Sequence, residues 1–198
     1  MPRLMDSTRA ARRDQILRAA QACFARRGYH QTTMEDIAAE AGIAKGAAYI
    51  YFDGKEAIFL ALYDAWGCAL REEIEQELEA LPHAERSSAK RALRVVVEVT
   101  GRHVQAHAPA CRVLMEGRSL AAYIPAIGAR VAREQAEGQR QLESLLQAGV
   151  TAGEWPSTTD VPMRATLVRA ALHGLMATWH AAPGSFDWAV AAAALVDW

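Results

Sequence analysis

A glycine-punctuated segment between Thr32 and Lys55 constrains the fold of this chain more than any other feature of its sequence. Gly42 can adopt the positive φ that a tight turn requires, and the small Ala38 lets two helices approach closely. Apolar residues on both sides of the turn recur at helical spacing and should face inward: Ile37, Ala41, Ile43 and Ala48. This pattern predicts two short helices joined by a turn, which is a helix-turn-helix.

The second of these helices has small and polar residues on its outward face, namely Lys45, Gly46, Ala47 and Tyr49. A cation and a hydroxyl can bind base edges or phosphates, and a glycine lets the backbone come close to a ligand. A short helix with such a face suits the major groove of DNA. We therefore expect double-stranded DNA to be a partner of this chain.

Positive charge is concentrated near this segment. The chain as a whole has a net charge of −1, which argues against a protein that coats nucleic acid without specificity. The first 34 residues, however, hold seven arginines against Asp6 and Asp14. Arg9, Arg12 and Arg13 precede or open the first expected helix, where DNA contact and a solvated charge cluster are equally compatible with the sequence.

The remaining residues follow a helical period, with no strand-like alternation bounded by turns. The sequence therefore predicts an all-α fold of about nine helices. We expect a three-helix DNA-binding domain over residues 1–54 and a helical effector-binding and dimerisation domain over residues 55–198. Gly28 should end a first helix that begins near Ser7. Two pairs of residues have the form of a capping box: Thr33 with Asp36, and Asp53 with Glu56.

The chain shows no targeting or membrane signal. Its start has no apolar signal segment, and its longest apolar stretch, residues 188–196, is too short to span a bilayer. Three cysteines in no C-x-x-C spacing suit reduced thiols. We therefore expect a cytoplasmic location and no membrane partner.

Residues 13–59 resemble the TetR family of one-component bacterial transcription regulators. The positions that carry the resemblance are Ile16, Leu17, Ala19, Ala20, Phe24, Gly28, Tyr29, Thr32, Thr33, Ile37, Ala38, Ala41, Gly42, Ile43, Lys45, Gly46, Tyr49, Tyr51, Phe52, Lys55 and Glu56. The resemblance implies a homodimer that binds a palindromic operator, usually as a repressor, and is released by a small, largely apolar effector in its helical domain. The C-terminal part resembles the family only in its number and layout of helices.

From the helix-turn-helix pattern and this resemblance we assign DNA contacts to Thr33, Ala44, Lys45, Gly46, Ala47, Tyr49, Tyr51 and Lys55. Thr33 is first a helix cap, and Tyr51 is as well suited to packing as to DNA. A lone cation such as Lys55 is unfavourable in the first turn of a helix, so a phosphate contact is its preferred interpretation. The family often has Ser or Thr where this chain has Ala44 and Ala47, so direct base readout should be thin and DNA shape more important.

The helical domain has residues that interrupt apolar helix faces and so could line an effector pocket. We nominate Trp66, Leu70, Thr100, His103, His107, Arg118, Tyr123, His173 and Met176. An aromatic residue or a methionine at helical spacing is more often part of the core, so we expect roughly a third of this set to line the pocket.

The last two expected helices are rich in small residues, among them Ala170, Gly174 and Ala177. Small residues permit close helix packing, and the resembled family forms its dimer through these two helices. We therefore expect a homodimer interface there, with packing inside one subunit as the alternative.

The sequence leaves three alternatives to this interpretation: a metal-responsive regulator, a redox sensor and an enzyme. His103, His107 and Cys111 stand at i, i+4 and i+8, which suits a metal, although Pro109 breaks the helix between the last two. A redox sensor could use Cys68 or Cys111. No nucleophile elbow, phosphate-binding loop or metalloprotease motif is present, so we expect no enzyme, no cofactor and no committed metal ligand.

Overall fold

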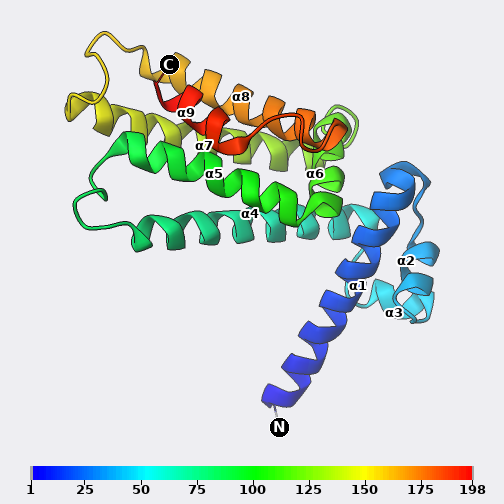
Figure 1. Cartoon of the computed structure of the whole chain (residues 1–198). Helices are drawn as coiled ribbons and strands as arrows, with labels where there is room; N and C mark the ends of the chain where they lie inside the picture. Colours follow the sequence, from blue (N-terminus) through cyan, green and yellow to red (C-terminus); the bar gives the residue numbers. More distant parts are fainter. Residues whose placement is uncertain (1, 198) are drawn as a thin grey trace. The chain divides into compact units, whose positions relative to one another are not determined.

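The computed structural model describes residues 2–197, and the side chains from Thr8 onward. Within these residues every regular element is an α-helix, which confirms the all-α expectation (Figure 1). The helices are α1 (Pro2–Gln31), α2 (Met34–Glu40), α3 (Lys45–Tyr49), α4 (Lys55–Ala80), α5 (Ala89–Ala106), α6 (Ala108–Leu120), α7 (Pro125–Thr151), α8 (Val161–Ala181) and α9 (Trp188–Asp197). None of the described helices is long and apolar enough to cross a membrane.

Two of the local boundary signals act as expected. The Thr33 hydroxyl accepts the Asp36 N–H, and the Asp36 carboxylate accepts the Thr33 N–H, so the capping box at the start of α2 is confirmed. Gly28 has φ 77° and interrupts the helical geometry of α1 at the residue where the sequence predicted the first helix to end. Gly42 has φ 65°, which makes the turn between α2 and α3.

Three other boundaries differ from the expectation. The first helix begins at Pro2 and not near Ser7. At the start of α4 the Gly54 carbonyl accepts the Ile58 N–H, so Gly54 and not Asp53 occupies the capping position. Pro109 was expected to break a helix between His107 and Cys111, but it lies inside the first turn of α6. Proline is tolerated there because the missing N–H would have no helical partner.

The chain forms two compact units. The first unit comprises residues 1–67 and 109–130, and the second comprises residues 68–108 and 131–198. Helices α1, α2 and α3 therefore share a unit with the start of α4 and with α6, whereas α5, α8 and α9 belong to the second unit.

The core of the first unit is built from aromatic side chains. Phe24, Tyr29 and Phe59 are buried, and their ring centroids lie 5.5 to 6.1 Å apart. Gly117 on α6 lies against this cluster, because a Cβ there would come within 3.2 Å of the Phe59 ring. Helix α6 thus packs close to the aromatic core that supports the helix-turn-helix.

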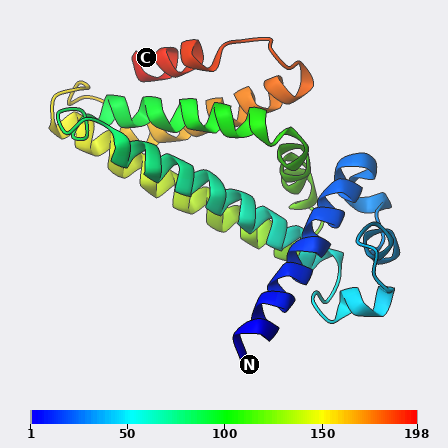
Figure 2. The same cartoon turned by 60° about the horizontal axis from the view of Figure 1, so that its bottom comes forward.

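In the second unit α5 packs against α9 and α8 (Figures 1 and 2). Gly101 makes the approach to α9 possible, since a Cβ at this position would lie 2.4 Å from the Trp188 ring. The last turn of α9 is tied down by its Val196 carbonyl, which accepts hydrogen bonds from Trp155 Nε1 and Arg164 Nη2, both at 3.2 Å. The C-terminal helix is therefore fixed to the second unit at both ends.

Candidate DNA-binding surface

The helix-turn-helix is built on a small apolar interior. Ile37, Ala41 and Ala48 are at most 5% exposed, as their spacing predicted, whereas Ile43, expected to face inward with them, is only half-buried. The small Ala38 is also buried, at 2% exposed. Gln15 on α1 adds a polar tie, since its Nε2 donates to the Ala41 carbonyl at 2.6 Å. This bond satisfies a carbonyl at the end of α2, so the turn that positions α3 is anchored to the longer α1.

Helix α3 leaves most of its expected contact residues open. Ala44, Lys45 and Gly46 are exposed, Ala47 is half-buried, and Tyr49 is 45% exposed. A Cβ built at Gly46 would meet nothing within 4 Å, so no packing inside the chain requires a glycine there.

One exposed residue at the end of this helix was missed in the sequence. Ile50 is the C-cap residue of α3 and is 70% exposed. An apolar side chain there can contact a thymine methyl group. Tyr51, one residue on, is half-buried, in keeping with its equal suitability for packing and for DNA.

The polar groups of α3 are few. Ala44 is the N-cap residue and provides no side-chain cap, so the first N–H groups of the helix have no partner from that side chain. These N–H groups can donate to a phosphate, although a helix of five residues has little dipole to add. Lys45 forms an ion pair with Glu35 on α2, and both side chains are about half exposed.

Lys55 has a different role from the one its sequence position suggested. Its ammonium donates to the carbonyls of Tyr29, His30 and Thr32 at 2.8, 3.2 and 3.1 Å. These bonds use all three ammonium hydrogens, and the nitrogen lies 4.4 Å from the centroid of the Tyr29 ring. Burial lowers the pKa of Lys55, while the charge of Glu116 opposes that shift. We therefore assign Lys55 to capping the end of α1 and not to a phosphate.

Glu116 on α6 holds the same turn, and sequence reasoning missed it. Both of its carboxylate oxygens accept the Tyr29 N–H, at 3.0 and 3.1 Å. Oε1 also lies 3.2 Å from the position that a Cβ on Gly28 would occupy. The two residues are 87 positions apart, so no local pattern could have linked them.

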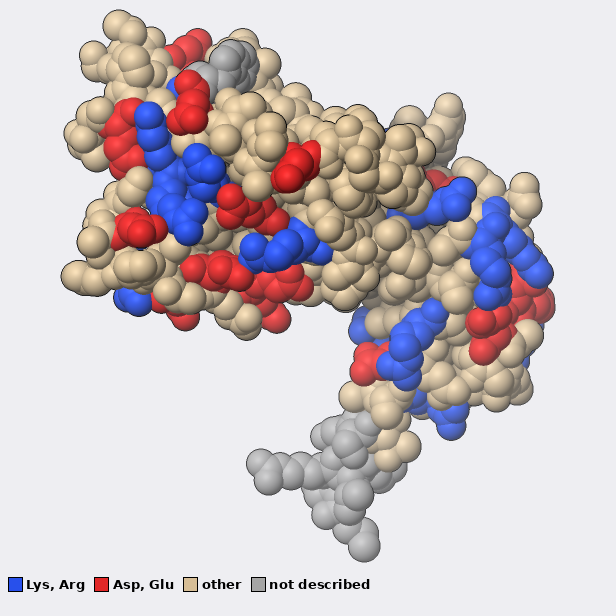
Figure 3. All heavy atoms as spheres, in the orientation of Figure 1, with Lys and Arg blue, Asp and Glu red and all other residues tan. Residues whose placement is uncertain are grey.

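Two of the arginines near the helix-turn-helix form ion pairs within the chain. Arg26 pairs with Glu40 at 2.6 Å, and Arg27 pairs with Asp36 at 2.8 Å. On the face drawn in Figure 3, acidic side chains lie beside basic ones over this unit. The local excess of positive charge is therefore smaller at the surface than the residue counts suggested.

The nine nominated effector residues fall in different surroundings. Trp66, Arg118 and Tyr123 belong to the first unit, where Arg118 is exposed and Tyr123 is 78% exposed. Two side chains this open to solvent do not line an enclosed space. Trp66 is half-buried.

The other six nominated residues lie in the second unit: Leu70, Thr100, His103, His107, His173 and Met176. Leu70 packs against a buried cluster that includes Val95 and Val99, so it contributes to the packing of α4 on α5. Thr100 is buried, and its hydroxyl donates to the carbonyl one turn earlier. Met176 is buried and His173 half-buried. The structure brings His103 together with His107, and with Glu73 as well.

The cysteines give no support to redox sensing through Cys111. This thiol is fully buried, and burial raises its pKa to about 11. A thiol protonated at neutral pH is a poor nucleophile, and the neighbouring Arg112 expected to activate it does not offset the burial. Cys68 is exposed and accepts a contact from Arg71 at 3.2 Å.

Comparison with known proteins gives matches at both ends of the chain. The family model described as bacterial regulatory proteins, tetR family, matches residues 16–62. The model described as the C-terminal region of MAATS-type transcriptional repressors matches residues 127–198.

Individual relatives match along most of the chain. The fatty acid metabolism regulator protein of Bacillus subtilis (strain 168) is 26% identical over 171 residues, covering 83% of this chain and 81% of that protein. The probable HTH-type transcriptional regulator ArpR of Pseudomonas putida is 26% identical over 180 residues, covering 88% and 83%. The fold is similar to that of FadR from Bacillus subtilis in complex with stearoyl-CoA, with a TM-score of 0.75, 21% identity and coverage of 92% of this chain and 95% of that one.

A helix-turn-helix with an open second helix, an all-helical remainder and these matches agree with one another. The proteins that the chain resembles are transcriptional regulators and not enzymes. The chain belongs to the TetR family of bacterial DNA-binding transcriptional regulators.

Proposed function

We propose that this chain is a repressor that binds a palindromic operator as a homodimer and leaves it when a small, largely apolar effector binds its helical domain. The observation that carries the proposal is the open face of α3. Lys45, Gly46 and Tyr49 are exposed on a helix whose inner residue Ala48 is buried. A helix with these properties suits the major groove.

We assign the direct DNA contacts to α3 and its flanks: Thr33, Ala44, Lys45, Gly46, Ala47, Tyr49 and Tyr51. On DNA, Lys45 would exchange the carboxylate of Glu35 for a phosphate or a guanine edge. An exposed ion pair contributes little to stability, so this exchange costs little. Tyr49 would supply a hydroxyl to a base edge.

Dimerisation is proposed through α8 and α9. Met163 and Leu167 on α8 are 53% and 40% exposed, and Val190 on α9 is 67% exposed. Ala170 and Gly174 continue the exposed row on α8, and a Cβ built at Gly174 would meet nothing within 4 Å. A row of apolar and small residues open to solvent suits a second copy of the same face, because a two-fold interface is self-complementary.

The chemical class of the effector is proposed from the ligand of a similar structure and from two side chains of α8. The FadR structure contains stearoyl-CoA, a ligand with a long apolar chain. Met176 on α8 is buried and His173 on the same helix is half-buried, and these two side chains are our candidates for an apolar contact and a polar anchor. We therefore propose an effector with a large apolar part.

The route from effector to DNA is proposed to pass through α4 and α6. Helix α4 begins in the first unit at Lys55 and continues into the second. Lys55 on α4 and Glu116 on α6 both bind the turn that follows α1. A shift of either helix would change the support of the helix-turn-helix. Effector binding then weakens DNA binding to the extent that it favours the shifted arrangement.

Selection from random duplexes tests this function. The protein is incubated with a library of random duplex DNA, and bound sequences are recovered over several rounds. The proposal predicts enrichment of an inverted repeat and a complex whose mass contains an even number of chains. Acyl-CoAs of increasing acyl-chain length are then added to the protein–DNA complex. Those with longer acyl chains should release the protein from the DNA. Enrichment of no sequence, or of a single half-site by one chain, would contradict the proposal.

A further inference from the structure

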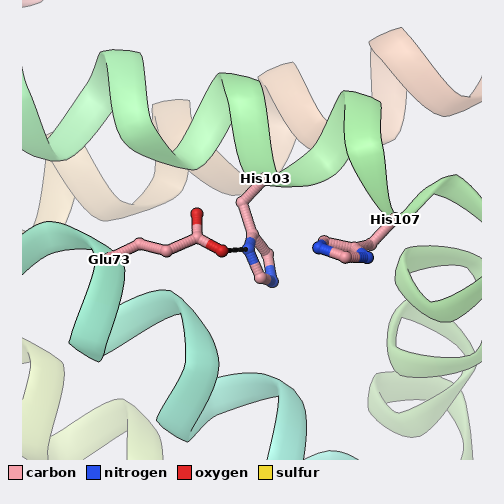
Figure 4. A group of neighbouring side chains, drawn as sticks. All are labelled: Glu73, His103 and His107. Carbon is pink, nitrogen blue, oxygen red and sulfur yellow. Dashed lines mark hydrogen bonds and ion pairs between the residues drawn. The ribbon is translucent and has the colours of Figure 1, made fainter.

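Three potential metal ligands meet in the second unit, and the DNA-binding function makes no use of them. Glu73 comes from α4, His103 from the last turn of α5, and His107 from the residue just after that helix. One donor atom from each lies within 4.8 Å of the other two. Figure 4 shows the Glu73 carboxylate and the His107 ring both pointing toward the ring of His103. The sequence suggested the two histidines but paired them with Cys111 instead.

We propose that Glu73, His103 and His107 form a binding site for a divalent transition-metal ion of the zinc class. Two imidazoles and one carboxylate are a known zinc donor set, and they leave a fourth position for water or for a ligand atom. Neutral imidazole also binds copper and nickel, whereas magnesium and calcium prefer sites made of oxygen atoms. The proposal concerns metal binding by the free protein and does not depend on the operator or the effector.

The geometry is close to that of a formed site. Donor atoms around a tetrahedral zinc ion lie about 3.3 Å apart, given zinc–nitrogen bonds of about 2.0–2.1 Å. His103 Nδ1 and Glu73 Oε1 are already 2.8 Å apart, and the two imidazole centroids are 4.6 Å apart. Small side-chain rotations would bring the three donors onto one ion. Glu73 and His107 can rotate, because the Glu73 side chain is 42% exposed and His107 is exposed.

The fixed member of the site is His103, which is 2% exposed. Its position relative to α4 is also set by a second cross-helix contact one turn away, where Arg102 pairs with Glu77 at 2.6 Å. Arg102, the cation next to His103 on α5, is therefore paired with Glu77 and not with Glu73. His107 follows at i+4 and is the C-cap of α5, with non-helical φ −121° and ψ 37°, and its N–H donates to the His103 carbonyl. One buried ligand and two adjustable ones suit a site that closes on an ion arriving from solvent.

Zinc titration of metal-free, tag-free protein tests the site. We expect one zinc ion per chain with a dissociation constant of about 10 μM or tighter by calorimetry, and a rise in melting temperature with added zinc. His107→Ala and Glu73→Gln should each weaken binding at least tenfold, by analogy with losses of about 10- to 100-fold for disturbed metal sites. His107→Ala removes an exposed side chain, so it should fold normally.

His83→Ala is the matched control, because His83 is an exposed histidine of the same unit outside the group. It should leave zinc affinity unchanged. The proposal is overturned if the wild-type protein binds no zinc below about 1 mM, or if both site variants bind it as tightly as the wild type does. In that case Glu73 and His103 form a structural hydrogen bond and nothing more. Neither result would bear on DNA binding.

Discussion

The carboxylate of Glu116 accepts the backbone N–H of Tyr29 with both of its oxygens, at 3.0 and 3.1 Å. Through this contact α6 holds the turn at Gly28 from which α2 and the DNA-binding helix follow. Lys55 binds three carbonyls of the same turn from α4. Two charged side chains from two different helices therefore fix where the helix-turn-helix begins.

Removing this carboxylate should loosen that turn. Glu116→Ala leaves the partly buried Tyr29 N–H without its acceptor, so we expect a loss of about 1–3 kcal/mol in the free energy of unfolding and weaker operator binding. Glu116→Gln keeps an acceptor oxygen and should lose less on both counts. Urea unfolding and fluorescence anisotropy with operator DNA measure the two effects. An alanine variant that matches the wild type in both stability and operator affinity would show that the contact between Glu116 and Tyr29 contributes to neither.

Lys45 and Lys55 should differ in the salt dependence of binding. Lys45→Ala removes a charge that we propose contacts DNA, so the slope of log affinity against log salt should fall by about one unit. Lys55→Met removes a helix cap, so it should weaken binding and stability while leaving the slope unchanged. Affinity measured at several salt concentrations separates the two. A slope reduced by about one unit for Lys55→Met would restore the phosphate contact inferred from its sequence position.

Glu154 should make the protein acid-sensitive. Partial burial favours its protonated form, but hydrogen bonds from the N–H groups of Lys90 and Ala89 and from the Ser88 hydroxyl lower its pKa overall. The stabilisation is therefore complete above the ordinary glutamate pKa of about 4.3 and is lost as the pH falls through the lower folded value.

Glu154→Gln should accordingly lower the free energy of unfolding by about 1–2 kcal/mol at pH 7. The gap between variant and wild type should close as the pH falls below about 4. Urea unfolding across this pH range provides the measurement. A gap that persists undiminished at pH 3 would mean that the charge of Glu154 is not what stabilises the start of α5.

Substitutions at two glycines of the second unit should affect different properties, the dimer in one case and the stability of the fold in the other. Gly174→Leu adds a side chain where nothing lies within 4 Å, so the single chain should fold normally, while the proposed dimer should dissociate at least tenfold more readily. Gly101→Ala places a Cβ against the Trp188 ring and should destabilise the fold by about 1–3 kcal/mol. Sedimentation equilibrium and thermal unfolding give the two quantities. A Gly174→Leu variant that dimerises as the wild type does would exclude α8 from the interface.

Local patterns predicted local structure. The capping box at Thr33 and Asp36 and the turn at Gly42 depend on residues within a few positions of one another, and both are present. The helical period identified α4 to α9 for the same reason. Asp53 failed as a cap because Gly54 takes that position, a competition between neighbours that the pattern alone does not decide.

Contacts within each unit between residues far apart in the sequence depend on tertiary packing, so the sequence did not reveal them. Glu116 reaches Tyr29 across 87 positions, and Glu73 reaches His103 across 30. The spacing of His103 and His107 was recognised, but the third ligand was sought nearby in sequence, at Cys111. The charge of Lys55 was recognised as unusual, and only the packing of α4 on the end of α1 gives it a partner inside the chain.

We propose that the outward face of α3 contacts DNA, and a substitution at Gly46 tests this contact. Gly46→Leu introduces a side chain where nothing in the chain lies within 4 Å, and leucine favours a helix over glycine by up to about 1 kcal/mol. We predict unchanged or slightly higher stability, with operator affinity reduced at least tenfold, measured by anisotropy on the selected duplex. Wild-type affinity in a stably folded Gly46→Leu protein would contradict it.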